Sequence, residues 1–144
     1  MASEPARVFL KLSNDPRLVA GVGAAVAHVA EEAGFDARSQ ADLVAATEEA
    51  CRETLPLLAD ANARLCVYIE CFADRIEVTL EHPGQARPIA GLDSFAFPRA
   101  QEVNARGLSG LALLARVDRI LYNACGGISR MTLVKYLGMR PGKE

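Results

Sequence analysis

Hydrophobic and polar residues follow two different periods along the chain, and each change of period marks a change between strand and helix. The alternating run Arg7–Ser13 predicts a first strand. Apolar residues then recur every three or four positions, which predicts a helix with Asp15 as its N-cap, Pro16 in its first turn and an end near Gly34. The expected buried stripe of this helix comprises Leu18, Val22, Ala25, Val26 and Val29.

A second helix is expected to begin after Asp36, which can cap it, and to run to about Leu58. In the first helix, the run Gly21–Ala25 contains two glycines, but they do not lie in the strand-to-helix turn that a dinucleotide-binding fingerprint requires. We therefore expect these small residues to allow close packing between elements. The expected buried face of the second helix comprises Val44, Thr47, Cys51, Leu55 and Leu58.

Two further alternating runs, Arg64–Phe72 and Arg75–Glu81, predict strands joined by a turn at Ala73 and Asp74. The second of these runs has one apolar side and one polar side, as in an antiparallel sheet that helices cover on one face only. Its apolar side comprises Ile76, Val78 and Leu80, and its polar side comprises Glu77, Thr79 and Glu81.

The last third of the chain predicts an irregular segment, a helix and a strand pair. Prolines interrupt Pro83–Ala105, which is either a functional lid or a decorated surface loop. A helix is expected at Leu108–Val117, followed by strands at Arg119–Tyr122 and Ser129–Leu137 around a Gly-Gly turn. The resulting β-α-α-β-β-loop-α-β-β order predicts an α+β fold, a two-layer sandwich with helices on one face of a mostly antiparallel mixed sheet.

Composition limits the classes of function. The 144 residues, 51% of them hydrophobic, suit a single domain spanning 1–144. The net charge is −2 and there is no basic tract, so direct nucleic-acid binding is not expected. No apolar run is long enough for a membrane span and the start lacks a secretory signal pattern, so we expect a cytoplasmic protein. Its cysteines, which form no C-x-x-C pair, are expected to be free and mostly buried.

The tract around Gly107, Ser109 and Gly110 opens the predicted third helix. Glycines at a helix start let backbone N–H groups approach an anion closely, and the helix dipole favours negative charge there. Ser109 can act as a simple N-cap or can donate its hydroxyl to a phosphate. Without further evidence, such a loop is also typical of a helix start at which glycine is needed only for steric reasons and no anion is bound.

The order of the glycine tract, the helix and the final strand pair resembles the last third of the ATP-binding domain of bacterial anti-sigma-factor serine kinases. These are relatives of the sensor-histidine-kinase ATPase domain, the GHKL group with the Bergerat fold. The resemblance extends from Ser13–Val19 to Leu133–Lys135. It implies ATP and magnesium as cofactors, an anti-sigma-factor antagonist protein and a sigma factor as partners, and regulation of transcription by partner switching. A homodimer is also usual in this family.

Glu49 and Glu53 lie four positions apart and share one face of the second helix. One interpretation is a solvated face on which Arg52 and Arg64 soften their repulsion. The resemblance implies instead that Glu49 is the catalytic base and that Glu53, at the position of the family's asparagine, binds the magnesium ion. A carboxylate can ligate magnesium. It also adds a negative charge beside a triphosphate, which costs about 4 kcal/mol for like charges ~4 Å apart at an effective dielectric near 20.

The family's Asp-x-Gly-x-Gly motif, whose aspartate binds the adenine amino group, has no aligned equivalent in this chain. The resemblance implies that Gly84 stands for the last glycine and that Glu81 replaces the aspartate with a shift of one residue. His82 is expected to be an exposed turn residue. After the Gly-Gly turn, the resemblance implies that Ser129 lines the far side of the nucleotide pocket.

Two main functional hypotheses follow. The first is an anti-sigma-factor-like serine/threonine protein kinase domain that binds ATP, with the backbone at Gly107, Ser109 and Gly110 holding phosphate. The second is a nucleotide-free pseudo-kinase that acts as a regulatory protein-binding module. The altered residue Glu53 and the missing Asp-x-Gly favour the second hypothesis, whereas Glu49 and the glycine tract favour the first. A third, weaker hypothesis is an ATP-binding domain that works only beside another protein.

Overall fold

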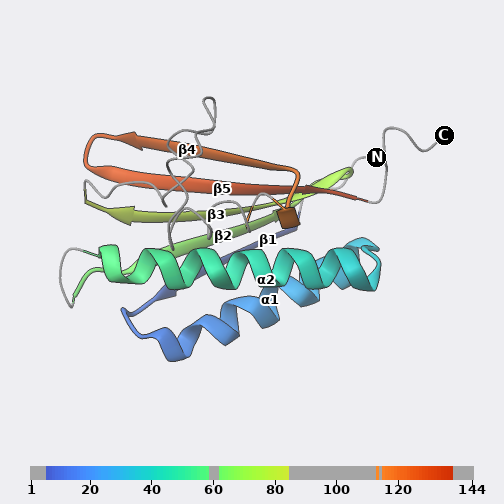
Figure 1. Cartoon of the computed structure of the whole chain (residues 1–144), viewed down its shortest axis with the longest axis horizontal. Helices are drawn as coiled ribbons and strands as arrows, with labels where there is room; N and C mark the ends of the chain where they lie inside the picture. Colours follow the sequence, from blue (N-terminus) through green and yellow to red (C-terminus); the bar gives the residue numbers. More distant parts are fainter. Residues whose placement is uncertain (1–5, 59–61, 85–112, 114, 138–144) are drawn as a thin grey trace.

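Helices and strands follow the two periods of the sequence. The computed structural model describes residues 6–58, 62–84, 113 and 115–137, and Figure 1 shows the path of the chain. Gly107, Ser109 and Gly110 lie outside the described residues. The elements are β1 (Ala6–Leu12), the short 3-10 helix η1 (Pro16–Leu18), α1 (Val19–Ala33), α2 (Ala37–Thr54), η2 (Leu55–Leu57), β2 (Leu65–Cys71), β3 (Arg75–Pro83), β4 (Arg119–Cys125) and β5 (Ile128–Tyr136).

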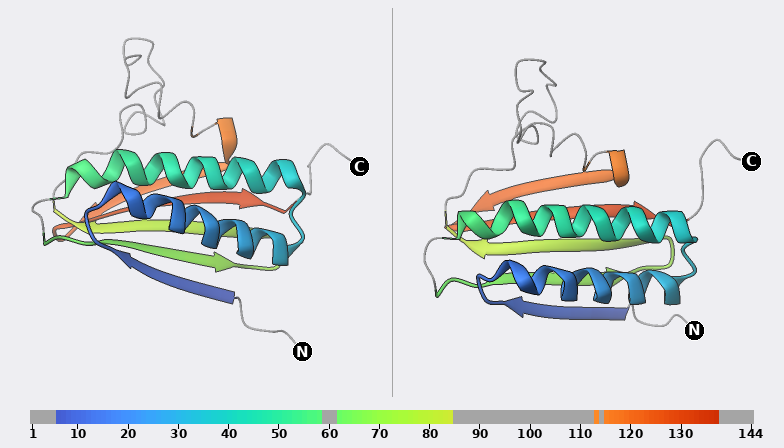
Figure 2. Two further views of the ribbon diagram at one scale, coloured as in Figure 1. Left: turned by 90° about the horizontal axis from the view of Figure 1, so that it is seen from below. Right: turned by 60° about the horizontal axis from the view of Figure 1, so that its bottom comes forward.

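The strands form one sheet in the order β1-β2-β3-β5-β4, and every pairing among the described residues is antiparallel. Both α1 and α2 lie on the same face of this sheet (Figures 1 and 2). The other face, which we call the open face, carries neither of these helices. The prediction of an α+β two-layer sandwich with helices on one face is therefore confirmed, but the sheet, expected to be mixed, is purely antiparallel among the described residues.

Local side-chain chemistry sets the helix ends where the sequence predicted them. The Asp36 carboxylate accepts a hydrogen bond from the Ser39 amide at 2.7 Å, and Gly34 ends α1 with a φ of 93°. Asp15 caps η1, and hydrogen bonds from Arg17 lower the pKa of its carboxyl to about 2. Leu18 belongs to that short helix and is 42% exposed, so its assignment to the buried stripe was wrong.

The inner face of the sheet and the two helices enclose the core. In β3, Ile76, Val78 and Leu80 are buried as the alternation predicted. The predicted face of α2 is also buried, except that Val44 is only half-buried. The pattern missed a further set of buried α2 residues, which comprises Ser39, Leu43, Ala46, Ala50 and Thr54.

The helices pack closely where Gly23 of α1 meets α2. A Cβ atom on Gly23 would overlap the carboxylate of Glu48, whereas a Cβ on Gly21 would meet nothing within 4 Å. The absent side chain at position 23 thus makes room for Glu48, which pairs with Arg52 one turn further along at 3.3 Å. The expectation that small residues allow close packing is confirmed for Gly23.

The cysteines are less buried than the sequence predicted. All four cysteines are free, as predicted, but only Cys51 is buried, and Cys125 is exposed. Burial raises the pKa of the Cys51 thiol to about 12, so this group is not a nucleophile.

None of the helices within the described ranges has the length and apolar character needed to cross a membrane.

We predict that Gly21→Ala raises the free energy of unfolding by about 0.5–1 kcal/mol, because alanine is the better residue in a helix interior and the site is open. Gly23→Ala should gain less, since Glu48 must move. Urea denaturation of both variants and of Gly23→Ala/Glu48→Ala measures this difference. Equal gains at positions 21 and 23 would contradict the packing described above.

The Thr47 hydroxyl is a buried oxygen with no hydrogen-bond partner in the part of the chain that the structure describes. We predict that Thr47→Val raises the free energy of unfolding by about 1 kcal/mol, because it removes an unsatisfied polar group at constant shape. Thr54→Val is the matched control, since the Thr54 hydroxyl donates to the Ala50 carbonyl at 2.7 Å. That variant should lose stability, and a gain at both positions would show that the Thr47 hydroxyl is not specifically unfavourable.

Candidate functional site

Three carboxylates follow one stripe of α2. Asp42, Glu49 and Glu53 are separated by seven and four positions, so they point in nearly the same direction from the helix axis. The Asp42 carboxylate lies 3.8 Å from the Lys135 ammonium of β5 and 3.7 Å from the Arg116 guanidinium. These contacts show that the stripe is on the side of α2 that faces β5 and the chain before β4.

The position of the stripe along β5 follows from element geometry. The strand β5 runs opposite to α2 in both views of Figure 2. At ~1.5 Å per helical residue, Glu49 and Glu53 lie roughly 10 and 16 Å beyond Asp42 along the axis. Counted from Lys135 toward the start of β5 at ~3.3 Å per strand residue, the same 16 Å corresponds to about five residues. Glu53 is therefore abreast of the beginning of β5, close to the level of Ser129.

The inner face of the sheet becomes polar at this same level. His82 of β3 and Ser129 of β5 are register partners, and only 5% and 2% of their surfaces are exposed. The Ser129 hydroxyl donates to the Gly84 carbonyl at 3.0 Å, and the Gly84 amide donates to the Gly127 carbonyl at 2.6 Å. Gly84 has a φ of 118°, which favours glycine. The structure thus brings Gly84 and Ser129 into direct contact.

The α2 carboxylates are partly neutralised by a neighbour. Arg52 lies 3.7 Å from the carboxylate of Glu49 as well as 3.3 Å from that of Glu48. The side chains of Glu49 and Glu53 are half-buried. This arrangement agrees with the interpretation that Arg52 softens the repulsion between the carboxylates of α2.

Glu81 does not join the α2 carboxylates. Its side chain lies on the open face, where it accepts hydrogen bonds from the Tyr68 hydroxyl at 3.0 Å and from the Arg130 Nε at 3.1 Å. The hydrogen bonds from Arg130 are the largest cause that holds the pKa of Glu81 below its ordinary value. Because α1 and α2 cover the other face, the inferred replacement of the family's aspartate by Glu81 does not fit its position in the fold.

His82 is the residue that the sequence interpretation missed. It was expected to be an exposed turn residue, but it is buried on the inner face, because β3 continues to Pro83. The alternation of β3 already contained the signal, since Ile76, Val78 and Leu80 share the face of the next even-numbered position. Its Nδ1 lies 2.9 Å from the Pro83 carbonyl oxygen.

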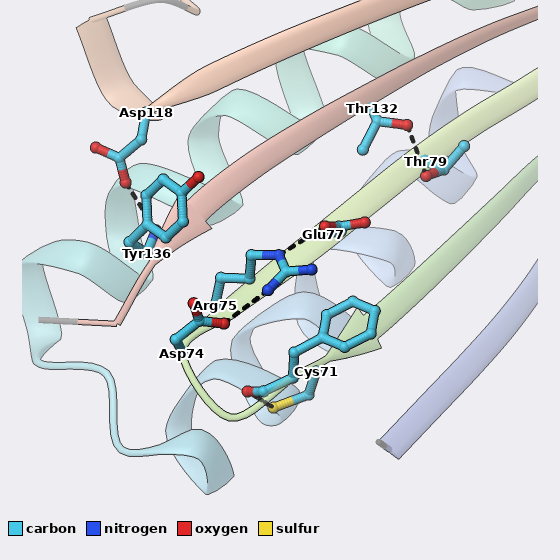
Figure 3. A network of polar contacts seen from close by, with 9 residues as sticks. Cys71, Asp74, Arg75, Glu77, Thr79, Asp118, Thr132 and Tyr136 are labelled. Atoms are coloured by element: carbon cyan, nitrogen blue, oxygen red, sulfur yellow. Dashed lines mark hydrogen bonds and ion pairs between the residues drawn. The ribbon is translucent and has the colours of Figure 1, made fainter. Parts of the chain in front are cut away.

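The open face has its own polar network, part of which Figure 3 shows. Arg75 pairs with Asp74 and Glu77, each at 2.7 Å, and the hydroxyls of Thr79 and Thr132 lie 2.9 Å apart. A shallow hollow of about 420 Å³ lies over this face. The two carboxylates that line this hollow are both paired, Glu77 with Arg75 and Glu70 with Arg7, so we assign no catalytic chemistry to the hollow. The residues that line the hollow are Tyr68, Glu70, Glu77, Thr79, Arg130 and Thr132.

The described residues offer no ready-made metal cluster. Among the described residues, no group of three or more histidine, cysteine, aspartate or glutamate side chains is arranged to hold a metal ion. This is compatible with a magnesium ion bound through one carboxylate and substrate phosphates, the way in which magnesium commonly binds in phosphoryl-transfer sites. It does not suit a metal held by the protein alone in the described part of the chain.

The chain is similar in fold to the crystal structure of the RsbU and RsbW domains of Rv1364c from Mycobacterium tuberculosis, with a TM-score of 0.66 and 15% sequence identity. The match covers 92% of this chain and 32% of that one, so the chain spans about a third of the length of its structural neighbour. At this identity the likeness shows the fold alone. No protein-family model and no curated protein matches the chain.

We predict that Arg130→Gln raises the pKa of Glu81, measured by carboxyl NMR titration. In the native protein the lowered pKa of Glu81 adds stability above the ordinary glutamate pKa, and this contribution is lost as the pH falls through the lowered value. The stability difference between the native protein and the variant should therefore be present at neutral pH and shrink on acidification. Arg7→Gln, which removes the 3.1 Å pairing with Glu70, should leave the pKa of Glu81 unchanged. A shift of the Glu81 pKa in Arg7→Gln but not in Arg130→Gln would contradict the conclusion that Arg130 lowers the pKa of Glu81.

Proposed function

We propose that this chain is an ATP-binding regulatory domain of the anti-sigma-factor kinase type, and that its nucleotide site lies between the stripe of α2 and the polar inner end of β3 and β5. The observation that carries the proposal is the level of Glu53 along α2, which brings it abreast of the pair His82 and Ser129. The shared fold with a structure that contains an RsbW domain supports it.

Magnesium would be needed to join the nucleotide to this site. The α2 stripe carries Asp42, Glu49 and Glu53, and a triphosphate beside them would be repelled without a cation. Glu53 would supply a carboxylate ligand to that cation, and the phosphates and water would supply the others. When bound, magnesium supplies neutralisation of the phosphate charge. Beyond the described residues, Gly107, Ser109 and Gly110 would offer backbone N–H groups to phosphate.

Glu49 would act as the general base. It would accept the proton of a serine or threonine hydroxyl as that oxygen forms its bond to the γ-phosphorus and the bond to the bridging oxygen of ADP breaks. The accepting hydroxyl would belong to an antagonist protein, and a sigma factor would compete for the same domain. We further propose that the protein acts in the cytoplasm and forms a homodimer, as the family resemblance implies.

The alternative is a nucleotide-free module that regulates through protein contacts. The specific observations that favour it are the pairing of Glu49 with Arg52 and the position of Glu81 on the open face. In that case the α2 stripe would be a solvated, internally paired surface.

A thermal-shift titration tests the proposal. Saturating Mg-ATP should raise the melting temperature by several degrees, because a ligand at ~100 times its Kd adds about 2.7 kcal/mol to the stability of the native state. ATP with EDTA should give no shift, because the carboxylates of α2 then face bare phosphate. An absence of any shift with millimolar Mg-ATP would refute the nucleotide site and leave the protein-binding module.

Variants separate the roles of the two glutamates. Glu53→Asn should enlarge the Mg-ATP shift, because it keeps an oxygen ligand and removes one negative charge. Glu53→Ala should reduce the shift, because it removes the ligand. Glu49→Gln, which changes a base but not a metal ligand, should keep the shift close to that of the native protein. Glu81→Gln on the open face is the matched control and should change nothing.

A further inference from the structure

The strand β1 forms a free edge of the sheet. It stands first in the strand order, so none of the described strands pairs with its outer side (Figure 2). In an antiparallel sheet, every second residue of an edge strand points its N–H and C=O groups away from the neighbouring strand. The pairing of β1 with β2 runs from Ala6 to Leu12 without a break, so this edge is long enough for another strand to pair with it.

The core reaches this edge. Val8 and Leu10 lie on the inner face of the sheet, where their register partners on β2 are fully buried. They pack against the core, but they are themselves only half-buried. Part of their apolar surface therefore remains in water, and an added strand with apolar residues on its inner side would cover it.

The open face of β1 alternates between basic and aromatic residues. Arg7 lies 3.1 Å from the Glu70 carboxylate, and the exposed Lys11 lies opposite Cys66 rather than opposite an acidic residue. Between them, Phe9 is 55% exposed, with its ring centre 4.9 Å from that of Tyr68. A strand added outside β1 would place its own side chains directly beside this basic, aromatic and basic row.

We propose that the β1 edge is a docking site for an extended segment of another protein, which pairs with β1 as an additional strand. Opposite charges and aromatic pairs stabilise neighbouring strands, so the segment would carry an acidic, an aromatic and an acidic residue on its open-face side. Its inner side would be apolar, to meet Val8 and Leu10. Since β2 and β3 separate β1 from β5, this surface goes beyond the proposed nucleotide site and does not require it.

Charge argues against two other occupants. If the β1 strands of two copies paired antiparallel over their full length, the Arg7 of each copy would lie opposite the Lys11 of the other, and like charges in that position are destabilising. The basic row thus disfavours self-pairing and favours an acidic partner. A nucleic-acid strand is disfavoured because Glu70 and Glu77 occupy the same open face and would repel phosphate.

Fluorescence polarisation with a labelled heptapeptide, Thr-Glu-Val-Tyr-Val-Glu-Thr, tests the inference. The sequence is palindromic, so its glutamates and tyrosine can meet the basic and aromatic row in either strand direction. We expect saturable binding to the full chain that weakens at high salt. Replacement of both glutamates by glutamine should weaken binding about 2- to 20-fold. Absence of saturable binding at millimolar protein would overturn the inference.

Variants of exposed residues locate the site. Lys11→Gln should weaken binding of the acidic peptide about two- to fivefold, and Phe9→Thr about two- to tenfold. Leu121→Thr is the matched control, because Leu121 is 45% exposed on β4 at the opposite edge of the sheet. That variant should bind like the native protein. Equal losses in Phe9→Thr and Leu121→Thr would overturn the assignment to β1.

Methylated peptides test the pairing of the main chains. Amides of neighbouring residues in a strand point to opposite edges, so methylating those of the two valines blocks one edge of the peptide. Methylating the amides of the tyrosine and the two glutamates blocks the other edge. One of these peptides should lose binding and the other should keep it. Retention by both would overturn strand pairing.

The remaining outcomes identify a different occupant. Tighter binding of a mixed-sequence single-stranded DNA than of the peptide, weakened in Lys11→Gln, would make the edge a nucleic-acid surface and overturn the inference. A homodimer that dissociates in Phe9→Thr would assign the edge to a second copy, with the same consequence. Neither result depends on Mg-ATP, so the inference and the proposed function can fail separately.

Discussion

The rest of the structure depends on the burial of one face of β3 beneath the two helices. Ile76, Val78 and Leu80 are buried away from water. Because side chains alternate between the two faces of a sheet, this burial fixes the face on which each remaining residue of β3 lies. Burying each side chain of this size contributes roughly 1.5–3 kcal/mol to the stability of the fold. A one-residue shift in the pairing register of β3 would expose all three side chains and lose these contributions together. This constraint sends His82 into the layer between sheet and helices and Glu81 out to the open face, whatever chemistry either residue performs.

The fold could be predicted because its signals are local. Alternating strands, the caps Asp15 and Asp36 and the terminating Gly34 act within a few residues, and each lies where the sequence indicated. Part of the buried surface of α2 was missed because alanines, such as Ala46 and Ala50, carry a weak hydrophobic signal and become buried only when another layer approaches. The assignment of Glu81 failed for a different reason, since a motif was aligned by residue type although the alternation already excluded that face.

The candidate site could be predicted only in part. Glu49 and Glu53 share a helix face by spacing alone, but their relation to β5 needed the contact between Asp42 and Lys135. Glu53, by contrast, is visible in the sequence alone as one added negative charge at the position where the resembled family has an asparagine.

The most direct measurement of the central claim is an NMR titration of the labelled protein with Mg-ATP, with amide shifts followed along α2, β3 and β5. The largest changes are expected at the amides of Glu49, Glu53, His82 and Ser129, while those of Tyr68 and Arg130 on the open face should stay near their original shifts. Changes concentrated on the open face, or none at saturating nucleotide, would contradict a nucleotide site between the helix layer and the sheet.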